Sequence, residues 1–145
     1  MSILVAVDLS PASEKVVEAA GRIAKLTNAP LYILHVAEPE PDFVGYDAGP
    51  EVVRTQVAHE LRREHRDVQA LAEKLRADGL DATALLIRGP TVETTLKEAN
   101  NLKAELIVVG THGHGAVYDV LIGSYSAGII RRSKLPVLVV PIQDS

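Results

Sequence analysis

The chain contains no cysteine, which excludes disulfide bonds, thiolate nucleophiles and zinc sites built on cysteine. No run of 18 apolar residues is present, so no membrane-spanning helix is expected. The amino-terminal sequence MSILVAVDLS has neither the basic region nor the small-residue cleavage site of a signal peptide. The net charge of −4 argues against sequence-independent binding of nucleic acid, which needs excess positive charge. We therefore expect a cytoplasmic protein that binds neither nucleic acid nor a membrane.

What is present is an ordinary globular composition, with 47% hydrophobic and 23% charged residues. Such a chain is not largely disordered. Its 145 residues are enough for one domain, which at this size buries roughly two-thirds of the surface of the unfolded chain. We expect residues 1–145 to form a single domain.

Short apolar runs rich in Val and Ile predict strands that are buried on both faces. The five runs are Ile3–Val7, Leu31–Val36, Ala84–Ile87, Leu106–Val109 and Pro136–Val140. Helical patterns separate them. Four helices are expected. The first follows an N-cap at Ser10 and has Pro11 in its first turn, and the second runs from Glu51 to Asp78. The third begins at Pro90, and the fourth runs from about Ser124 to Ser133 with Ile129 and Ile130 inward.

This alternation of strands and helices predicts a doubly wound α/β fold with a parallel sheet. Ligands of such sheets bind at the carboxyl ends of the strands. The irregular segment from Ala37 to Pro50 contains three prolines and two glycines and follows the second strand. The sequence leaves open whether this segment is a lid over the site or a surface excursion.

A glycine-rich segment after the fourth strand is suited to a phosphate chain. Gly110, Gly113 and Gly115 allow a sharp turn and a close approach of the backbone to a ligand. Gly123-Ser124 lies at the start of a predicted helix, where free N–H groups and the helix dipole favour an anion. The hydroxyl groups of Ser124 and Ser126 would add donors.

Two common phosphate-binding motifs are excluded. A P-loop requires a Gly-Lys pair, and the chain has none. In the Rossmann pattern G-x-G-x-x-G, Tyr118 stands where the third glycine belongs, and the turn follows the fourth strand rather than the first. The spacing that does occur is Gly-x2-Gly-x9-Gly-Ser, which comprises Gly110, Gly113, Gly123 and Ser124.

That spacing resembles the nucleotide-binding signature of the universal stress protein family, and the resemblance covers essentially the whole chain. VAVDLS at 5–10, LYILHV at 31–36, ELIVVGTHGHG at 105–115 and GSYSAGIIRRSKLPVLVVP at 123–141 are similar to successive family segments. The resemblance implies a three-layer fold like that of the adenine nucleotide alpha hydrolases, with a five-stranded parallel sheet in the order 3-2-1-4-5. It also implies a homodimer and ATP binding.

The resemblance further implies which residues form the ATP site. Asp8 would contact the adenosine, Val36 would offer its backbone to the adenine, the glycine turn would hold ribose and phosphates, and Ser124 to Ser126 would hold the terminal phosphates. The implied site comprises Ala6, Val7, Asp8, Leu9, Ser10, Val36, Val109, Gly110, Thr111, His112, Gly113, His114, Gly115, Ala116, Gly123, Ser124, Tyr125 and Ser126.

One departure from the family pattern concerns charge. Family members commonly carry a basic residue between the glycine turn and the Gly-Ser pair, whereas Ala116–Ile122 contains Asp119 and neither Lys nor Arg. This favours either Mg²⁺ with ATP or a shorter phosphate chain, as in AMP. The pair His112 and His114 lacks a third ligand nearby, so no metal site built from protein side chains is expected.

Three functions remain in competition. The first is a nucleotide-binding regulatory module in the stress response, without catalytic residues and with little or no turnover. The second is an adenylating or pyrophosphate-releasing enzyme, which the segment AVDLSPAS disfavours because it lacks the glycine pair of an SGGxDS-type loop. The third is a dimeric interaction protein whose site holds AMP or is empty. The apolar segment Pro136–Ile142 would supply the dimer contact as an edge strand that pairs with its copy.

Overall fold

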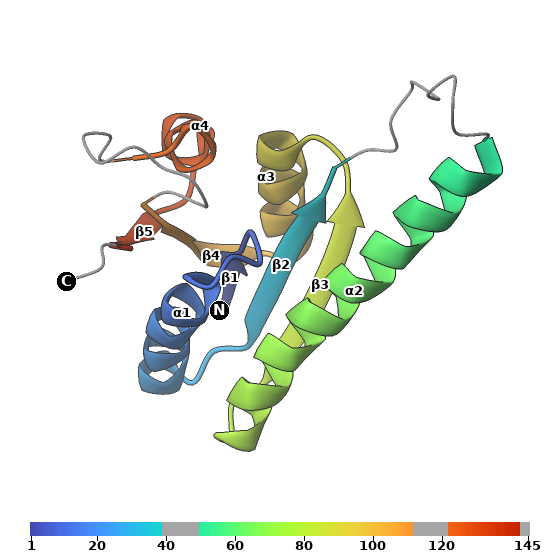
Figure 1. The fold of residues 1–145 in the computed structure, drawn as a ribbon. Helices are drawn as coiled ribbons and strands as arrows, with labels where there is room; N and C mark the ends of the chain where they lie inside the picture. Colours follow the sequence, from blue (N-terminus) through green and yellow to red (C-terminus); the bar gives the residue numbers. More distant parts are fainter. Residues whose placement is uncertain (39–49, 112–121, 143–145) are drawn as a thin grey trace.

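Strands and helices alternate along the chain in the computed structural model, which describes residues 1–38, 50–111 and 122–142 (Figure 1). The order is β1 (Ser2–Ala6), α1 (Ser13–Thr27), β2 (Leu31–Ala37), α2 (Pro50–Ala77), β3 (Ala82–Arg88), α3 (Thr91–Asn101), β4 (Ala104–Gly110), α4 (Ser124–Arg132) and β5 (Val137–Val140). The predicted α/β class is confirmed. Of the helices described, none is long and apolar enough to cross a membrane.

The five strands form one parallel sheet in the order β3-β2-β1-β4-β5, as the family resemblance implied. The chain builds outward from β1 to β2 and β3, and then crosses to the other side of β1 to form β4 and β5. The direction of winding therefore reverses between β1 and β4. A crevice opens at such a reversal, at the carboxyl ends of the two strands.

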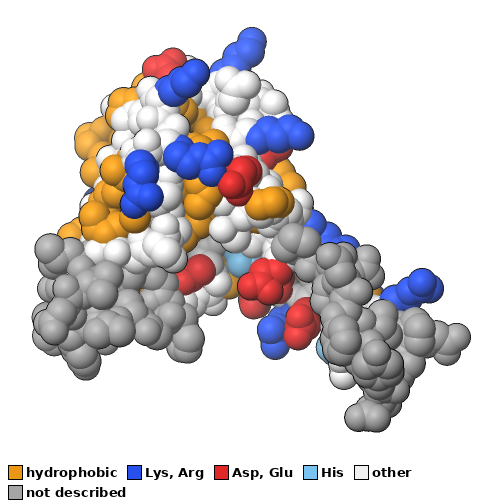
Figure 2. Space-filling view, turned by 90° about the horizontal axis from the view of Figure 1, so that it is seen from above, with side chains coloured by type: hydrophobic (Ala, Val, Ile, Leu, Met, Phe, Trp, Pro, Cys, Tyr) orange, Lys and Arg blue, Asp and Glu red, His pale blue; other side chains and the backbone are white. Residues whose placement is uncertain are grey.

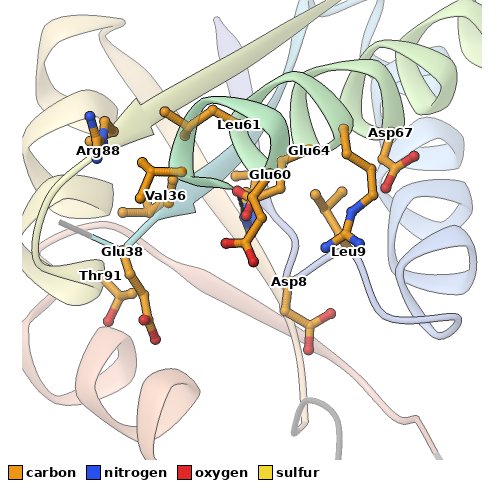
Figure 3. Close-up of a pocket in the computed structure, with 14 residues that line it drawn as sticks. Asp8, Leu9, Val36, Glu38, Glu60, Leu61, Glu64, Asp67, Arg88 and Thr91 are labelled. Carbon is orange, nitrogen blue, oxygen red and sulfur yellow. Dashed lines mark hydrogen bonds and ion pairs between the residues drawn. The ribbon is translucent and has the colours of Figure 1, made fainter. Parts of the chain in front are cut away.

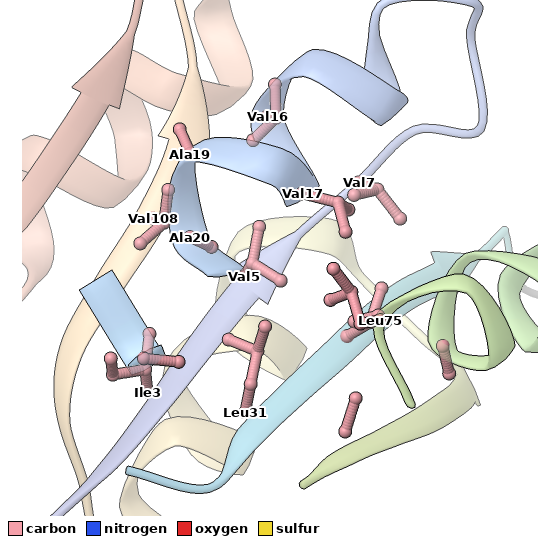
Figure 4. Packing of buried hydrophobic residues seen from close by; sticks show 14 of the residues in the cluster. Ile3, Val5, Val7, Val16, Val17, Ala19, Ala20, Leu31, Leu75 and Val108 are labelled. Atoms are coloured by element: carbon pink, nitrogen blue, oxygen red, sulfur yellow. The ribbon is translucent and has the colours of Figure 1, made fainter. Parts of the chain in front are cut away.

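Both faces of the central strand are buried, because the side chains of β1 alternate between two hydrophobic clusters. Ile3 and Val5 pack under α1 and α2 (Figure 4). Leu4 and Ala6 pack on the opposite face, against α3 and α4. This two-sided burial explains why the strand is a continuous apolar run rather than an alternating one.

The start of α1 differs from the prediction. The helix begins at Ser13 after an N-cap at Ala12 that offers no side-chain hydrogen bond, so the N-cap role of Ser10 is wrong. The N–H of Ser10 instead donates to Asp8 Oδ1 at 2.9 Å, and its carbonyl accepts from the N–H of Ser13 at 3.0 Å. Ser10 is thereby held in the turn that precedes the helix.

In α4 the prediction that two adjacent isoleucines face inward is half correct. Ile129 is fully buried, whereas 41% of Ile130 is exposed. The core-facing stripe of the helix contains Ser126 and Ile129, three residues apart, and the next residue along is rotated by about 100° away from that stripe.

The two neighbours provide a matched test of this orientation. Ile129→Ala should lower the free energy of unfolding by about 2–5 kcal/mol, because it opens a cavity in a closed core. Ile130→Ala should cost about 1 kcal/mol or less, because solvent already reaches that side chain. Urea unfolding monitored by circular dichroism measures both values. Equal losses would contradict the orientation of α4.

Candidate functional site

A cavity of about 870 Å³ opens at the carboxyl ends of β1 and β2, below α2 (Figure 3). Among the sequence-predicted site residues, Asp8, Leu9 and Val36 line it. Ala6 is the last residue of β1 and Val109 lies in β4, both buried in the sheet beside it. The remaining lining residues were not among the predicted site residues, although two of them begin the segment Ala37–Pro50: His35, Ala37, Glu38, Val57, Glu60, Leu61, Arg63, Glu64, Asp67, Arg88 and Thr91.

The turn after β1 is fixed by side-chain hydrogen bonds. Asp8 Oδ1 accepts from the N–H of Ser10 at 2.9 Å and from the hydroxyl of Ser13 at 3.2 Å. Leu9 adopts a φ of 64°, a left-handed conformation that costs a residue with a side chain roughly 1–2 kcal/mol. The hydroxyl of Ser10 is buried and, within the described residues, has no hydrogen-bond partner. Strain and an unpaired buried hydroxyl therefore coincide at this turn.

His35 joins three elements at the floor of the cavity. Its Nδ1 lies 2.9 Å from the carbonyl oxygen of Val7, which directly follows β1. Its Nε2 lies 2.9 Å from Glu64 Oε2, on α2. The sequence placed His35 only within the second expected strand, Leu31–Val36. It did not identify Glu64, which lies 29 residues further along the chain.

Carboxylates outnumber cationic side chains around this cavity. Figure 2 shows Asp and Glu side chains gathered around a hollow at this edge, with a histidine beside them. The carboxylates are those of Asp8, Glu38, Glu60, Glu64 and Asp67, and the guanidinium groups are those of Arg63 and Arg88. A group that donates hydrogen bonds, such as a sugar hydroxyl or an amino group, suits this lining better than a phosphate does.

A second part of the site has the opposite character and lies where β4 meets α4. The N–H of Gly123 donates to the carbonyl of Thr111 at 2.6 Å, which brings the start of α4 to the end of β4. Gly123 is the N-cap of α4 and supplies no side-chain cap, and Ser124 is exposed at the first helical position. The N–H groups of that first turn can therefore bind an anion.

The two hydroxyl groups that follow Ser124 are engaged within the protein. Ser126 is 4% exposed, and its hydroxyl donates to the carbonyl of Gly110 at 2.6 Å. The hydroxyl of Tyr125 lies 2.6 Å from Thr95 Oγ1, and Thr95 in turn donates to the carbonyl of Thr91 at 2.7 Å. Since the single hydroxyl proton of Thr95 is used there, Tyr125 is the donor to Thr95. In Tyr125 and Ser126, the backbone N–H groups and not the hydroxyl groups are therefore left to bind a ligand.

Gly110 has a packing reason to be glycine. A Cβ atom built on it would collide with the side chain of Ile142 and lie 3.2 Å from Val16 Cγ2. The sequence interpretation, which assigned this glycine to the approach of a ligand, missed that constraint. His112, Gly113, His114, Gly115 and Ala116, the remainder of the predicted phosphate loop, lie outside the described residues.

The described residues also bear on metal binding. Within residues 1–38, 50–111 and 122–142, no three or more His, Asp or Glu side chains are grouped so that they could hold a metal ion.

Comparison with known proteins places this geometry in a family. The family model that matches residues 1–141 is described as the universal stress protein family. A universal stress protein of Thermus aquaticus is 34% identical over 96% of this chain and 97% of its own length. Another, from Mycolicibacterium smegmatis, is 37% identical over 98% of this chain, which spans about half (48%) of that relative.

A solved structure supports the same relationship. It is described as a universal stress protein in complex with cAMP, and it superimposes with a TM-score of 0.74 at 26% identity, covering 99% of this chain and 98% of its own. The cAMP ligand is a property of that neighbouring structure.

Burial raises the pKa of Tyr125 to about 12, and the hydrogen bond with Thr95 lowers it by a smaller amount. The folded protein thus holds this proton more tightly than the unfolded chain, in which tyrosine titrates near pH 10. Stability that is complete below about pH 10 should therefore fall by on the order of 2 kcal/mol by about pH 12. Tyr125→Phe should lack this component.

Urea unfolding of both proteins at several alkaline pH values measures the difference between them. The deficit of Tyr125→Phe, which loses a hydrogen bond worth about 1 kcal/mol at neutral pH, should shrink as the pH rises above about 10 and reverse before about pH 12. A difference that stays constant would show that the phenol of Tyr125 is not buried.

Proposed function

Because the chain belongs to the universal stress protein family, we propose that it is an adenine-nucleotide-binding regulatory module and not an enzyme. The observation that carries this proposal is that two chemically opposite ends lie at the carboxyl ends of the strands, on either side of the point between β1 and β4 where the winding reverses. One end is the carboxylate-lined cavity beside Asp8 and Val36. The other is the uncapped amino terminus of α4.

A nucleotide has the matching polarity. Its sugar hydroxyls and the amino group of adenine are hydrogen-bond donors, which carboxylates and backbone carbonyls accept. Its phosphates are anions, which the N–H groups of a helix amino terminus bind. The nucleoside would therefore occupy the cavity, and the phosphates would lie at Ser124 and along the glycine turn. The cAMP complex of a 26% identical family member supports an adenine ligand.

The proposed role is binding without turnover. The phosphate end of the described site provides backbone N–H groups and the hydroxyl of Ser124, whereas the carboxylates surround the nucleoside end. A general base for hydrolysis would need to stand near the terminal phosphate. Binding would then act by favouring one conformation of a protein that contacts a partner in the stress response. The cytoplasmic location remains a prediction.

ATP with Mg²⁺ and AMP are both proposed ligands, because Ala116–Ile122 supplies no basic side chain to a triphosphate. The same feature supports the second candidate function, a dimeric interaction protein with AMP or an empty site. Native mass spectrometry of the purified protein distinguishes them. A retained ATP–Mg²⁺ mass supports the first candidate, and AMP or no ligand supports the second.

Ser124→Asp tests the phosphate end. A carboxylate in the first turn of α4 suits the helix dipole, so the stability of the fold should be kept or raised. The same charge repels a phosphate, and we expect the Kd for ATP and AMP to rise about tenfold or more, which corresponds to roughly 1.4 kcal/mol. Isothermal titration calorimetry measures the affinity.

Ser124→Ala is the matched control, because it keeps the backbone donors and adds no charge. Its Kd should stay within about threefold of the wild-type value, since one neutral hydrogen bond is worth about 1 kcal/mol or less. An unchanged Kd in Ser124→Asp would show that the phosphates do not bind at the first turn of α4. A wild-type protein that binds neither nucleotide would contradict the proposed function itself.

We further propose that the protein forms a homodimer through β5, with residues 1–145 of each copy acting as one domain. β5 is the edge strand beside β4. The backbone N–H and C=O groups of its successive residues point alternately toward β4 and away from it. The carbonyl of Pro136 accepts from the N–H of Ile107 in β4, and the carbonyl of Val140 accepts from the N–H of Thr111, which directly follows β4. In a parallel ladder the intervening odd positions direct their N–H and C=O groups to the other side. Val137 and Val139 thus offer donors and acceptors to the edge strand of a second copy.

Val139→Pro tests this interface without touching the ladder between β4 and β5. Proline is tolerated where the N–H of an edge strand points outward, so the fold should persist. The lost donor and the proline ring should block antiparallel pairing with a second copy. Light scattering should report a dimer for the wild type and a folded monomer for the variant. A wild-type monomer at micromolar concentration would refute the dimer.

A further inference from the structure

A second cavity lies at the edge of the sheet opposite the candidate nucleotide site. Its volume is about 470 Å³, within the range of roughly 300–1,000 Å³ that is usual for binding pockets. It opens where α3 leads into β4 and where α4 leads into β5. None of its lining residues also lines the cavity beside Asp8. The two cavities can therefore be occupied at the same time.

The position of α4 on α3 creates this second cavity. A Cβ atom on Gly128 would lie only 2.9 Å from Val92 Cγ2, and Tyr125 is hydrogen-bonded to Thr95. These contacts hold α4 against the amino-terminal half of α3. The cavity lies beside the other half of α3, between that helix and the segment that follows α4.

The floor of the second cavity is apolar. It is formed by Ala104 and Ile107, which are both buried in β4, together with the half-buried side chains of Leu96 and Leu135. An apolar group that entered the cavity would cover this floor and be removed from water itself, which is favourable.

The charges at the rim of the second cavity are all positive. They belong to Lys103, Arg132 and Lys134, and none of the described residues that line the cavity carries a carboxylate. Arg132 has a partner, because its Nη1 lies 2.8 Å from Glu93 Oε1. Neither of the two lysines forms an ion pair with another described residue, and both are exposed. An anionic group at this rim would therefore meet two unbalanced positive charges.

The backbone of Lys103 adopts a conformation that is unfavourable for lysine. Its φ is 54°, and it directly follows Leu102, the C-cap of α3, where glycine or asparagine is usual. A cation after a helix also suits the helix dipole, but that interaction does not require a left-handed residue. Strained positions of this kind cluster at ligand-binding sites. The strain thus indicates a role for Lys103 beyond ending the helix.

We propose that the second cavity is the docking site for an acidic segment of a partner protein. An apolar side chain of that segment would occupy the cavity, and its flanking carboxylates would contact Lys103 and Lys134. An apolar anchor in a pocket, surrounded by charges of complementary sign, is the usual arrangement of a specific protein interface. This inference goes beyond the proposed nucleotide binding and does not depend on it.

The shape of the cavity favours a protein segment over a membrane or a nucleic acid. A bilayer takes up apolar groups that protrude from a protein, whereas Ile107 is recessed and fully buried. A nucleic-acid backbone would use the cations and leave the apolar floor uncovered, and the net charge of −4 opposes its binding. A leucine flanked by aspartate and glutamate matches both the floor and the rim.

The probe is the acetylated and amidated peptide Glu-Asp-Leu-Leu-Asp-Glu. Added to nitrogen-15-labelled protein without nucleotide, it should give saturable shifts of the backbone amides in residues 96–104 and 132–135. Two control peptides have serine in place of both leucines or lysine in place of all acidic residues. Each should bind with a Kd at least about fivefold higher, because one lacks the apolar anchor and the other the complementary charge.

Lys103→Asn separates binding from folding. Asparagine adopts a left-handed conformation more readily than lysine does, so the melting temperature should be unchanged or higher. The lost charge should raise the Kd for the acidic peptide about fivefold or more. Lys97→Gln is the matched control, because it removes an exposed lysine of α3 that does not line the cavity. Its Kd should stay within about twofold of the wild-type value.

Saturable binding at this cavity that weakens in Lys103→Asn supports the proposal. An absence of peptide binding, shifts confined to other residues, or an unchanged Kd in Lys103→Asn would overturn it. Peptide binding by Val139→Pro and not by the wild type would show that a second copy covers the cavity. Binding of phosphatidylglycerol vesicles without binding of the peptide would indicate a membrane surface. Either of these results would also overturn the proposal, and neither affects the calorimetric test of nucleotide binding.

Discussion

The structure depends on the burial of β1 on both of its faces. All five residues of this strand are buried, and the two hydrophobic clusters meet on it from opposite sides. A strand in this position cannot slip by one residue without exchanging the side chains of the two clusters. Its carboxyl end is therefore held in one register relative to β2 and β4. The turn with Asp8 and Leu9 and the bridge through His35 are both positioned relative to it.

Much of the fold could be predicted because its determinants are local. Continuous Val and Ile runs indicate doubly buried strands, and helical patterns of apolar residues indicate the helices between them. The order of the strands came from resemblance to the universal stress proteins and not from the residues themselves. The errors arose where a side chain has two possible uses. Ser10 has the chemistry of an N-cap, yet Asp8 holds it in a turn, and Ile130 is as apolar as Ile129 but lies 100° around the helix.

The site was harder to predict because its partners are distant in sequence. Asp8 and Val36 were assigned by family motif, and both line the cavity. The carboxylates of α2 resemble an ordinary exposed helix face, since nothing in the helix itself shows that Glu64 meets a histidine of β2. The same holds for Tyr125, because its hydroxyl is hydrogen-bonded to Thr95, which lies 30 residues earlier in the chain. Motif reasoning identifies which segments converge, whereas the engagement of each hydroxyl or carboxylate depends on the tertiary contacts.

Thr111 stands at a junction of three elements. Its N–H donates to the carbonyl of Val140, its carbonyl accepts from the N–H of Gly123, and its hydroxyl accepts from the N–H of Ile142 at 3.1 Å. The first turn of α4 and the end of the edge strand β5 thus share one residue. The proposed ligand at the N–H groups of α4 and the proposed second chain at β5 would therefore both contact elements that Thr111 joins, and any coupling between the two binding events would act in both directions. If the ligand strengthens dimer formation by some factor, dimer formation strengthens the binding of the ligand by the same factor.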